Sequence, residues 1–389
     1  MRQPVLLRWQ ASPLFGWGIV GLNLFQWWAS DPDVQPLLGS PIVRRHLPSV
    51  DPLRLNAIWP AALASNSFLE QLTAGSIDLQ QRGVVVIDAL GNGLIPPTPR
   101  LIGARTVGRC IFENTRIKIT EQLAPYDSLL CASHWAADVL RSLSDKPVAL
   151  IHEGIDPALF FPGPRSGLLD PSRFYVFSGG KIEFRKAQDL VILAFREFAA
   201  RHSDAVLVTM WDSPWTQADF QGKLPAPLRR AADGTFDVQS WVAENGVPLE
   251  QFIELRATPN HLMPFVLREM DCAVQVSRCE ACTNLPAKEA MACGVPVILA
   301  NNTGTRDLLD VGNCVALNSQ GPVAGRPGQG TDGWGESSVE EIVAALETLY
   351  TDTQLRKRIS SCGAAWILQH RRTWADHAAA LKAHLLQLV

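Results

Sequence analysis

Two lysines and two glycines in the run FSGGKIEFRKAQDLV (residues 177–191) have the types and the spacing to hold a phosphate group. Gly179 and Gly180 fall where an apolar strand pattern changes to a helical one, and Lys181 and Lys186 follow five residues apart. Glycines let a ligand approach the backbone, and the amides at a helix N-terminus favour anions. Two ammonium groups here predict a clamp that binds a diphosphate and stabilises it as a leaving group. The alternative is that both lysines are solvated surface charges.

The run CEACTNLPAKEAMACGVPVILA (residues 279–300) carries a C-x-x-C pair, Cys279 and Cys282. A structural zinc site needs two more ligands, and the sequence has no second C-x-x-C and no closely spaced pair of histidines to supply them. A thioredoxin-like redox pair would open a helix in a different motif context. We therefore expect buried, neutral thiols at these positions and no metal ion.

The same run carries two glutamates, Glu280 and Glu289, on either side of a predicted helix start at Pro286. A carboxylate can accept two hydrogen bonds from a vicinal diol, so one glutamate could hold a ribose and the other a hexose. The loop amides around Thr283 and Asn284 point at whatever joins the two sugars, which suggests phosphate. A glutamate in the first helical turn also stabilises the helix dipole, but that explains only one of the two.

A second glycine pattern, FGWGIVG (residues 15–21), contains G-x-G-x-x-G at Gly16, Gly18 and Gly21. A dinucleotide site would need this loop directly after a strand and an acid after the second strand, and neither is present. A glycine loop that lines an interdomain cleft, or plain turn-and-helix packing, are the other interpretations. The D-x-D at residues 31–33 is interpreted as a turn rather than a metal site.

Short apolar runs alternate with helical patterns along the whole chain, which indicates parallel sheets covered on both faces. The expected strands are 4–9, 33–38, 83–90, 128–133, 173–180, 205–211, 272–277 and 295–300, and the expected helices are 21–29, 134–143, 187–202, 286–293 and 374–388. A Pro/Gly-rich break at 160–172 is interpreted as an interdomain linker. The run at 319–338, also rich in glycine, is predicted to be a surface loop.

The fold class that follows is α/β, with two doubly wound, Rossmann-like domains and a ligand cleft between them. We place the N-terminal, acceptor-side domain at residues 1–163 and the C-terminal, donor domain at residues 164–365. The helix within residues 366–389 carries an apolar stripe, and we expect it to pack back on the first domain.

Composition limits the function classes. The chain has 389 residues, of which 47% are hydrophobic, and 35 Lys+Arg against 38 Asp+Glu give a formal net charge of -3. This balance gives no long-range attraction to nucleic acid. The sequence has no signal-peptide pattern and no long apolar span, and its eight cysteines are scattered. We expect a cytoplasmic enzyme without a transmembrane segment, for which peripheral membrane association stays open.

Three segments resemble those of the GT-B glycosyltransferases of family 4, which are retaining enzymes that use sugar nucleotides. GGKIEFRKAQDLVILAF resembles the family's G-R-x4-K-G segment, IHEGIDPALFFP its G-[VI]-D-x3-F-x-P, and the run from Cys279 its E-x7-E-A-M-A-x-G-x-P-V block. The resemblance is strong over residues 150–310 and weaker before them, where it rests on the glycine loop, FENTRI and YDSLLCASHWAADVLRS.

The resemblance implies a role for each candidate residue. Lys181 and Lys186 would hold the donor diphosphate, Glu280 would contact donor-sugar hydroxyls, and Glu289 would contact the ribose. Amides around Thr283, Asn284 and Leu285 would contact phosphate or sugar, with Gly16 and Gly18 closing over the site. The implied mechanism needs no metal or cofactor. The resemblance also implies a front-face reaction in which the leaving phosphate itself assists deprotonation of the acceptor, which is a glycan, lipid or protein.

The sequence departs from the family pattern at three positions. Lys181 replaces the usual arginine and exchanges a two-pronged guanidinium for a point charge. Eight residues rather than seven separate Glu280 from Glu289. Glu113 stands where many members have a histidine, which makes it a candidate for the reaction centre or the acceptor side, or else a structural residue. A sugar-nucleotide epimerase and a non-catalytic scaffold are the alternatives to a transferase.

Overall fold

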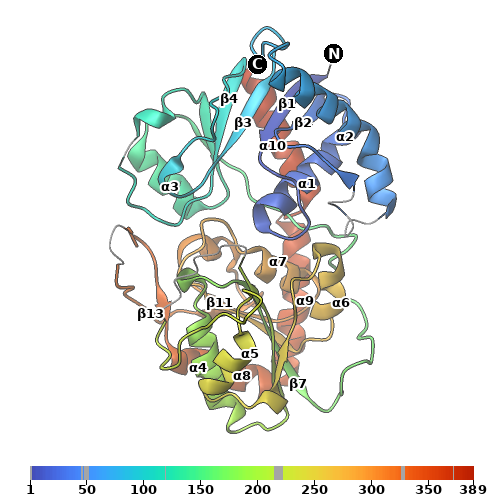
Figure 1. The fold of residues 1–389 in the computed structure, drawn as a ribbon. Coiled ribbons are helices and arrows are strands. Elements are labelled where there is room, and N and C mark those ends of the chain that lie inside the picture. The colour runs from blue at the N-terminus through green and yellow to red at the C-terminus, as the bar shows by residue number, and fades with distance from the viewer. Residues whose placement is uncertain are drawn as a thin grey trace.

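The computed structural model describes residues 2–44, 47, 52–118, 120–213, 222–325, 329–370 and 372–389. It contains two six-stranded sheets in which every pairing between neighbouring strands is parallel. Each sheet forms its own layered unit with helices around it, and the two units lie one above the other (Figure 1). The predicted α/β class with two Rossmann-like domains is therefore confirmed.

The first sheet has the strand order β2-β1-β3-β4-β5-β6. Its strands are β1 (Gln3–Arg8), β2 (Val34–Leu38), β3 (Val85–Leu90), β4 (Arg105–Cys110), β5 (Ser128–Cys131) and β6 (Val148–Leu150). The central strand β3 reads VVIDAL and has five of its six residues buried, as a parallel strand covered on both faces requires. Sequence periodicity thus located all of these strands except β4 and β6.

Three α-helices cover this sheet, α1 (Gly16–Ala29), α2 (Pro52–Thr73) and α3 (His134–Leu143). Helix α3 begins as its sequence predicts, because the Ser133 hydroxyl accepts a hydrogen bond from the amide of Ala136. Helix α1 begins five residues earlier than predicted and includes Gly16. The short 3-10 helices η2 (Asn92–Leu94) and η3 (Glu121–Leu123) lie between strands.

The second sheet has the order β12-β11-β10-β7-β8-β9. Its strands are β7 (Phe174–Lys181), β8 (Ala205–Asp212), β9 (Phe252–Glu254), β10 (Cys272–Gln275), β11 (Val297–Ala300) and β12 (Val315–Leu317), and β13 (Gln320–Gly321) and β14 (Glu336–Ser337) form a separate hairpin. The helices are α4 (Gln188–Ala199), α5 (Val238–Glu244), α6 (Met263–Leu267), α7 (Leu285–Ala292), α8 (Val339–Thr351) and α9 (Thr353–Gln369), with the 3-10 helices η4 (Phe184–Lys186), η5 (Leu249–Gln251), η6 (Asn260–Leu262) and η7 (Thr303–Leu308).

The last helix, α10 (Trp374–Leu388), packs on the first sheet's unit, beside α1 (Figure 1). Its buried stripe of Trp374, Ala378, Leu381 and Leu385 belongs to the same apolar core as β1 and α1. The chain therefore crosses between the units twice, and the two crossings meet where Ile155 bridges Thr373. Among the described residues, no helix is long and apolar enough to cross a membrane.

Candidate functional site

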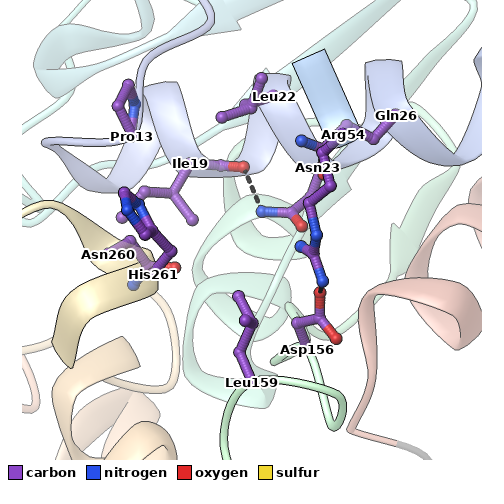
Figure 2. Close-up of a pocket in the computed structure, with 10 residues that line it drawn as sticks. All are labelled: Pro13, Ile19, Leu22, Asn23, Gln26, Arg54, Asp156, Leu159, Asn260 and His261. Atoms are coloured by element: carbon purple, nitrogen blue, oxygen red, sulfur yellow. Dashed lines mark hydrogen bonds and ion pairs between the residues drawn. The ribbon is translucent and has the colours of Figure 1, made fainter. Parts of the chain in front are cut away.

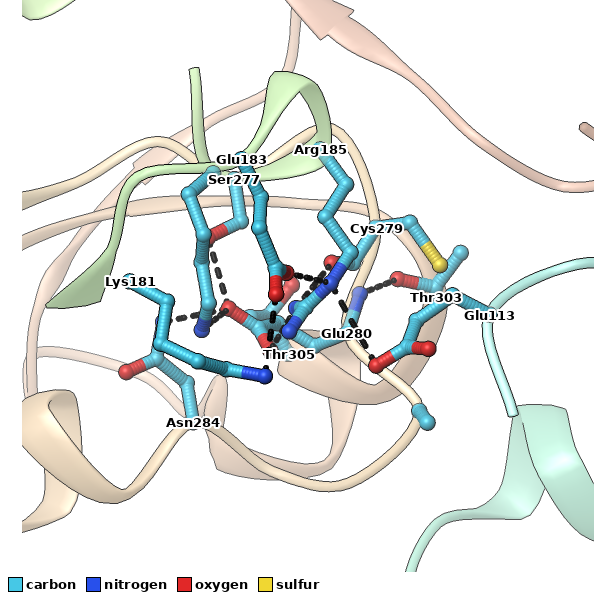
Figure 3. Close-up of polar contacts among 12 residues, drawn as sticks. Glu113, Lys181, Glu183, Arg185, Ser277, Cys279, Glu280, Asn284, Thr303 and Thr305 are labelled. Carbon is cyan, nitrogen blue, oxygen red and sulfur yellow. Dashed lines mark hydrogen bonds and ion pairs between the residues drawn. The ribbon is translucent and has the colours of Figure 1, made fainter. Parts of the chain in front are cut away.

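The carboxyl ends of β7 and β10 bring a lysine, an arginine and a glutamate together in a buried ionic cluster (Figure 3). Lys186 Nζ lies 2.6 Å from Glu280 Oε1, and Arg185 Nη1 lies 3.1 Å from Glu280 Oε2. Because neighbouring parallel strands end at the same edge of a sheet, segments about 100 residues apart in sequence meet here. The structure thus brings together two predicted site residues, Lys186 and Glu280.

Neutral side chains fix the carboxylate of Glu280 in this position. The Ser277 hydroxyl and the Asn284 amide donate to Glu280 Oε1 at 2.6 and 3.0 Å, and the Glu280 backbone amide donates to the Thr303 hydroxyl at 2.9 Å. Burial alone would raise the pKa of Glu280, but the nearby Lys186 and Arg185 charges and the hydrogen bonds from Lys186 and Ser277 lower it. Glu280 is therefore an ionised carboxylate aimed at the cations, and only 5% of it is exposed.

Arg185 is the residue that the sequence reasoning missed. Its guanidinium contacts three carboxylates, with Nε 2.6 Å from Glu183 Oε2 and 3.3 Å from Glu113 Oε1, in addition to Glu280. Glu113 follows β4 of the first unit, so Arg185 connects the two units at the cluster. The signal was present in the sequence as the charged run Lys-x-Glu-x-Arg-Lys, but its alternation with apolar residues reads as one face of a strand, whereas β7 ends at Lys181 and Arg185 lies in the short helix η4.

Lys181, at the end of β7, pairs with Glu183 at 2.9 Å and is about one-third exposed. Figure 3 shows its side chain beside Glu183 at the edge of the cluster. Gly180 has φ 139°, a backbone conformation that favours glycine. A Cβ on Gly179 would lie 2.8 Å from the Phe177 ring, so both glycines have conformational or packing reasons to be glycine.

Glu289 lies outside the cluster, on the buried face of α7. Asn260 Nδ2 donates to Glu289 Oε1 at 2.6 Å, and Glu289 is 7% exposed. Burial raises the pKa of Glu289 to about 7, against the hydrogen bond from Asn260 and the charge of Lys288, which lower it. Glu280 and Glu289 thus occupy different environments. Glu280 is ionised among cations, whereas the pKa of Glu289 lies near neutral pH.

A shallow cleft opens near Glu289, whose hydrogen-bond partner Asn260 forms part of the cleft wall (Figure 2). It lies between α1 and the segment that connects the two units. Figure 2 shows α1 side chains facing Asp156 and Leu159 across it, with Arg54 ion-paired to Asp156. The lining is Pro13, Ile19, Leu22, Asn23, Gln26, Arg54, Asp156, Leu159, Asn260 and His261. None of the cluster residues lines this cleft.

The loop before α7 is ordered by its own side chains. Asn284, with φ 58°, caps the helix by accepting from the amide of Ala287, and Thr283 is fully buried with its hydroxyl oxygen unpartnered. Leu285, the first helical residue, lies 4.0 Å from where a Cβ on Gly16 would stand. The N-terminus of α1 therefore approaches this loop across the interface between the units.

The glycines of FGWGIVG lie inside α1, so the prediction that they form a loop is wrong. A Cβ on Gly18 would lie 2.5 Å from Ser12 Cβ, and one on Gly21 would lie 2.6 Å from Trp9 Nε1. Helix packing explains both positions, and only Gly16 faces the other unit. The D-x-D is a turn, in which the Asp31 carboxylate accepts from the amide of Asp33.

All eight cysteines are free, and Cys110, Cys131, Cys272, Cys279 and Cys293 are buried. Burial raises the pKa of Cys279 and Cys282 well above the ordinary value. The expectation of neutral thiols at these two positions is therefore confirmed.

The glycine-rich run at 319–338 is not only a surface loop. Residues 326–328 lie outside the described part, but Trp334 is 7% exposed and its indole donates to the carbonyl of Glu113 at 3.1 Å. The amide of Thr115 donates to the carbonyl of Gly330 at 3.3 Å. Trp334 is therefore buried against the segment that carries Glu113, although the neighbouring Asp332 and Gly333 are exposed.

Further buried contacts join the two units around α7. The Ser133 hydroxyl donates to the carbonyl of Ala281 at 2.7 Å, and Lys288 Nζ donates to the carbonyl of Glu153 at 2.7 Å. The Glu153 carboxylate in turn pairs with Arg109 at 2.8 Å. The units are therefore closed on each other at the cluster.

No family profile and no curated protein matches this chain at the level of sequence. Solved structures do match, and they have the two-Rossmann-domain architecture called GT-B, so the chain has the GT-B fold. Sucrose-phosphate synthase from Thermosynechococcus elongatus is 15% identical, with a TM-score of 0.68 over 100% of this chain and 99% of that one. HepE from Anabaena in complex with UDP-glucose is 14% identical, with a TM-score of 0.65 over 99% and 100%. A glycosyltransferase from Rickettsia africae is 12% identical, with a TM-score of 0.63 over 97% and 96%.

Proposed function

We propose that this protein is a retaining glycosyltransferase that moves a sugar from a nucleoside-diphosphate donor to an acceptor glycan, lipid or protein. The observation that carries the proposal is the ion pairing of Arg185 and Lys186 with Glu280 at the carboxyl ends of β7 and β10, with Lys181 beside them on Glu183, where this unit faces the other. Open α/β sheets bind their ligands at this edge, and three cations there suit a diphosphate.

In this proposal the carboxylates of the cluster form ion pairs with its cations until the donor binds. Glu280 and Glu183 neutralise Lys186, Arg185 and Lys181 in the structure, because buried charges without partners would be costly. A diphosphate brings negative charge to the same cations and releases Glu280 toward the sugar hydroxyls. The cations then stabilise the negative charge that develops on the leaving diphosphate.

In the proposed transfer, Glu113 helps to position Arg185 and does not act as a general base. It reaches the cluster from the acceptor-side unit and contacts Arg185. In this closed arrangement Glu113 would border the reaction centre together with the segment from Gly330 to Trp334, and both would exclude water from the transferred sugar. Glu289 holds the ribose, and amides around Thr283 and Leu285 contact the phosphates.

The remaining features of the proposal come from the resemblance and the composition. Transfer needs no metal or cofactor, since the lysines and the arginine supply the positive charge at the phosphates. The reaction is cytoplasmic, and membrane association, if the acceptor is a lipid, is peripheral. An epimerase on the same fold remains the alternative, as does a non-catalytic scaffold that binds nucleotide sugars.

A thermal-shift panel of UDP-, GDP-, ADP- and dTDP-sugars tests the proposal, because a ligand that binds only the folded state raises the melting temperature. We expect one base to give a clear rise and Lys186→Met to abolish it. The matched control is Lys357→Met, which removes an exposed lysine on α9. No rise with any donor would refute the proposal, and product formation without an acceptor would favour the epimerase.

A further inference from the structure

Two histidines and an aspartate converge at a second place between the units. His134 Nδ1 lies 3.0 Å from Asp307 Oδ2, and His152 Nε2 lies 2.9 Å from the same oxygen. One ligand atom from each of the three side chains lies within 4.8 Å of the others. His134 opens α3 and His152 follows β6 in the first unit, whereas Asp307 belongs to η7 of the second. Three separate segments of the fold thus build this group.

The three side chains of this group differ in solvent exposure. The Asp307 side chain is 5% exposed, that of His152 21% and that of His134 68%. The carboxylate is therefore anchored inside the interface, whereas one imidazole reaches solvent. An ion could enter from the solvent side and keep a position open to water, as three-ligand zinc sites do.

The surroundings hold two of the three ligands in place. The amide of His134 donates to Asp307 Oδ2 at 2.9 Å, and His377 Nδ1 lies 2.8 Å from the carbonyl of His152. Arg372 donates to the backbone carbonyl of Asp307, not to its carboxylate. Among the described residues, these hydrogen bonds to the Asp307 carboxylate all go to Oδ2, so Oδ1 can face an ion while Oδ2 keeps its contact with the start of α3.

We propose that His134, His152 and Asp307 form a binding site for a divalent transition metal of the zinc class, which clamps the two units together. Two imidazoles and one carboxylate are ligands that zinc accepts, with water in the fourth position. The site shares no residue with the cluster around Glu280, so the metal has a structural role and the proposed transfer chemistry does not depend on it. Asp307 would serve as the ligand that joins the units.

Zinc titration of the EDTA-treated full chain, followed by calorimetry and by thermal shift, tests the site. We expect one ion per chain and a rise in melting temperature with added zinc alone, because the ion binds the folded, closed state. His152→Gln and Asp307→Asn should each weaken zinc binding about tenfold or more. His370→Gln is the matched control, since His370 lies 3.8 Å from Asp310 in an exposed pair that offers no third ligand.

His134→Gln keeps the proposal testable if the Asp307 variant does not fold, because His134 is mostly exposed and its replacement leaves the interior intact. It should fold normally, shown by an unchanged far-ultraviolet spectrum, and bind zinc more weakly. Zinc that neither binds stoichiometrically nor raises the melting temperature of the unmodified chain would overturn the proposal. So would binding that survives in both His134→Gln and His152→Gln. In either case the three side chains would be a hydrogen-bonded clasp only.

Discussion

Replacing Glu280 with glutamine removes a negative charge that the buried cations share. Lys186 and Arg185 contact the two oxygens of Glu280 at 2.6 and 3.1 Å. Breaking a buried ion pair costs about 3–5 kcal/mol, and the lower end applies because Arg185 keeps Glu113 and Glu183 as partners. We expect the free energy of unfolding to fall by about 3 kcal/mol.

The same substitution should strengthen binding of the bare nucleoside diphosphate. In the unmodified protein a diphosphate must displace the Glu280 carboxylate from Lys186 and Arg185, whereas in Glu280→Gln it supplies the missing charge. A gain of about 1.4 kcal/mol, close to the lower limit of about 1.5 kcal/mol for one hydrogen bond to a charged group, corresponds to about tenfold tighter binding. The full nucleotide sugar should gain less, because it loses the proposed carboxylate contact to its hydroxyls.

Urea unfolding followed by tryptophan fluorescence measures the stability, and calorimetry measures the two affinities. Glu347→Gln is the matched control, since Glu347 pairs with Arg201 and His202 at the surface, where such pairs contribute about 0–1 kcal/mol. Should folded Glu280→Gln bind the diphosphate no more tightly than the unmodified chain, Glu280 would not compete with the phosphates and the reasoning would fail.

Three further predictions follow from other parts of the structure. Arg185→Lys should lower the transfer rate by about tenfold or more in a donor-turnover assay, because one ammonium cannot bridge Glu113 and the diphosphate as a guanidinium does; an unchanged rate would contradict this. Glu289, with a pKa of about 7, is most favourable to the fold when protonated. The stability it contributes relative to Glu289→Gln should thus be full below about pH 4.5 and fall by about 3 kcal/mol as the pH rises through 7; a pH-independent difference between the two chains would refute the burial argument. Gly154→Ala should lower the melting temperature, since a Cβ there would lie 2.1 Å from the carbonyl carbon of Thr373. A melting temperature equal to that of the unmodified chain would show that the backbone at Thr373 can move to accept the methyl group.

The elements of the site were predictable because their signals are local. Apolar runs of strand length marked β7 and β10, the Gly-Gly pair marked the end of β7, and Pro286 marked the start of α7. The stripe on α10 predicted a buried face in the same way. Each signal depends on residues within one or two helical turns of each other, so a single sequence contains it in full.

Long-range partners were not predictable, because a residue's type does not say which distant segment it will meet. Arg185 is one residue from the predicted Lys186, yet its importance comes from Glu113, more than 70 residues earlier. The run at 319–338 has a loop composition, and only its packing on Glu113 turned Trp334 into a buried residue.

The sequence by itself determined the two α/β units, the strands and the helix that carry the phosphate-binding candidates, and the residue types available for phosphate binding. Tertiary structure decided that Glu280 faces Lys186, that Glu289 is separate and near neutrality, and that His134, His152 and Asp307 converge. The physical reason is that hydrophobic periodicity encodes which face of an element is buried. The pairing of charges across the two units depends instead on where parallel strands end, and on how the two chain crossings at Gly154 and Thr373 orient one unit relative to the other.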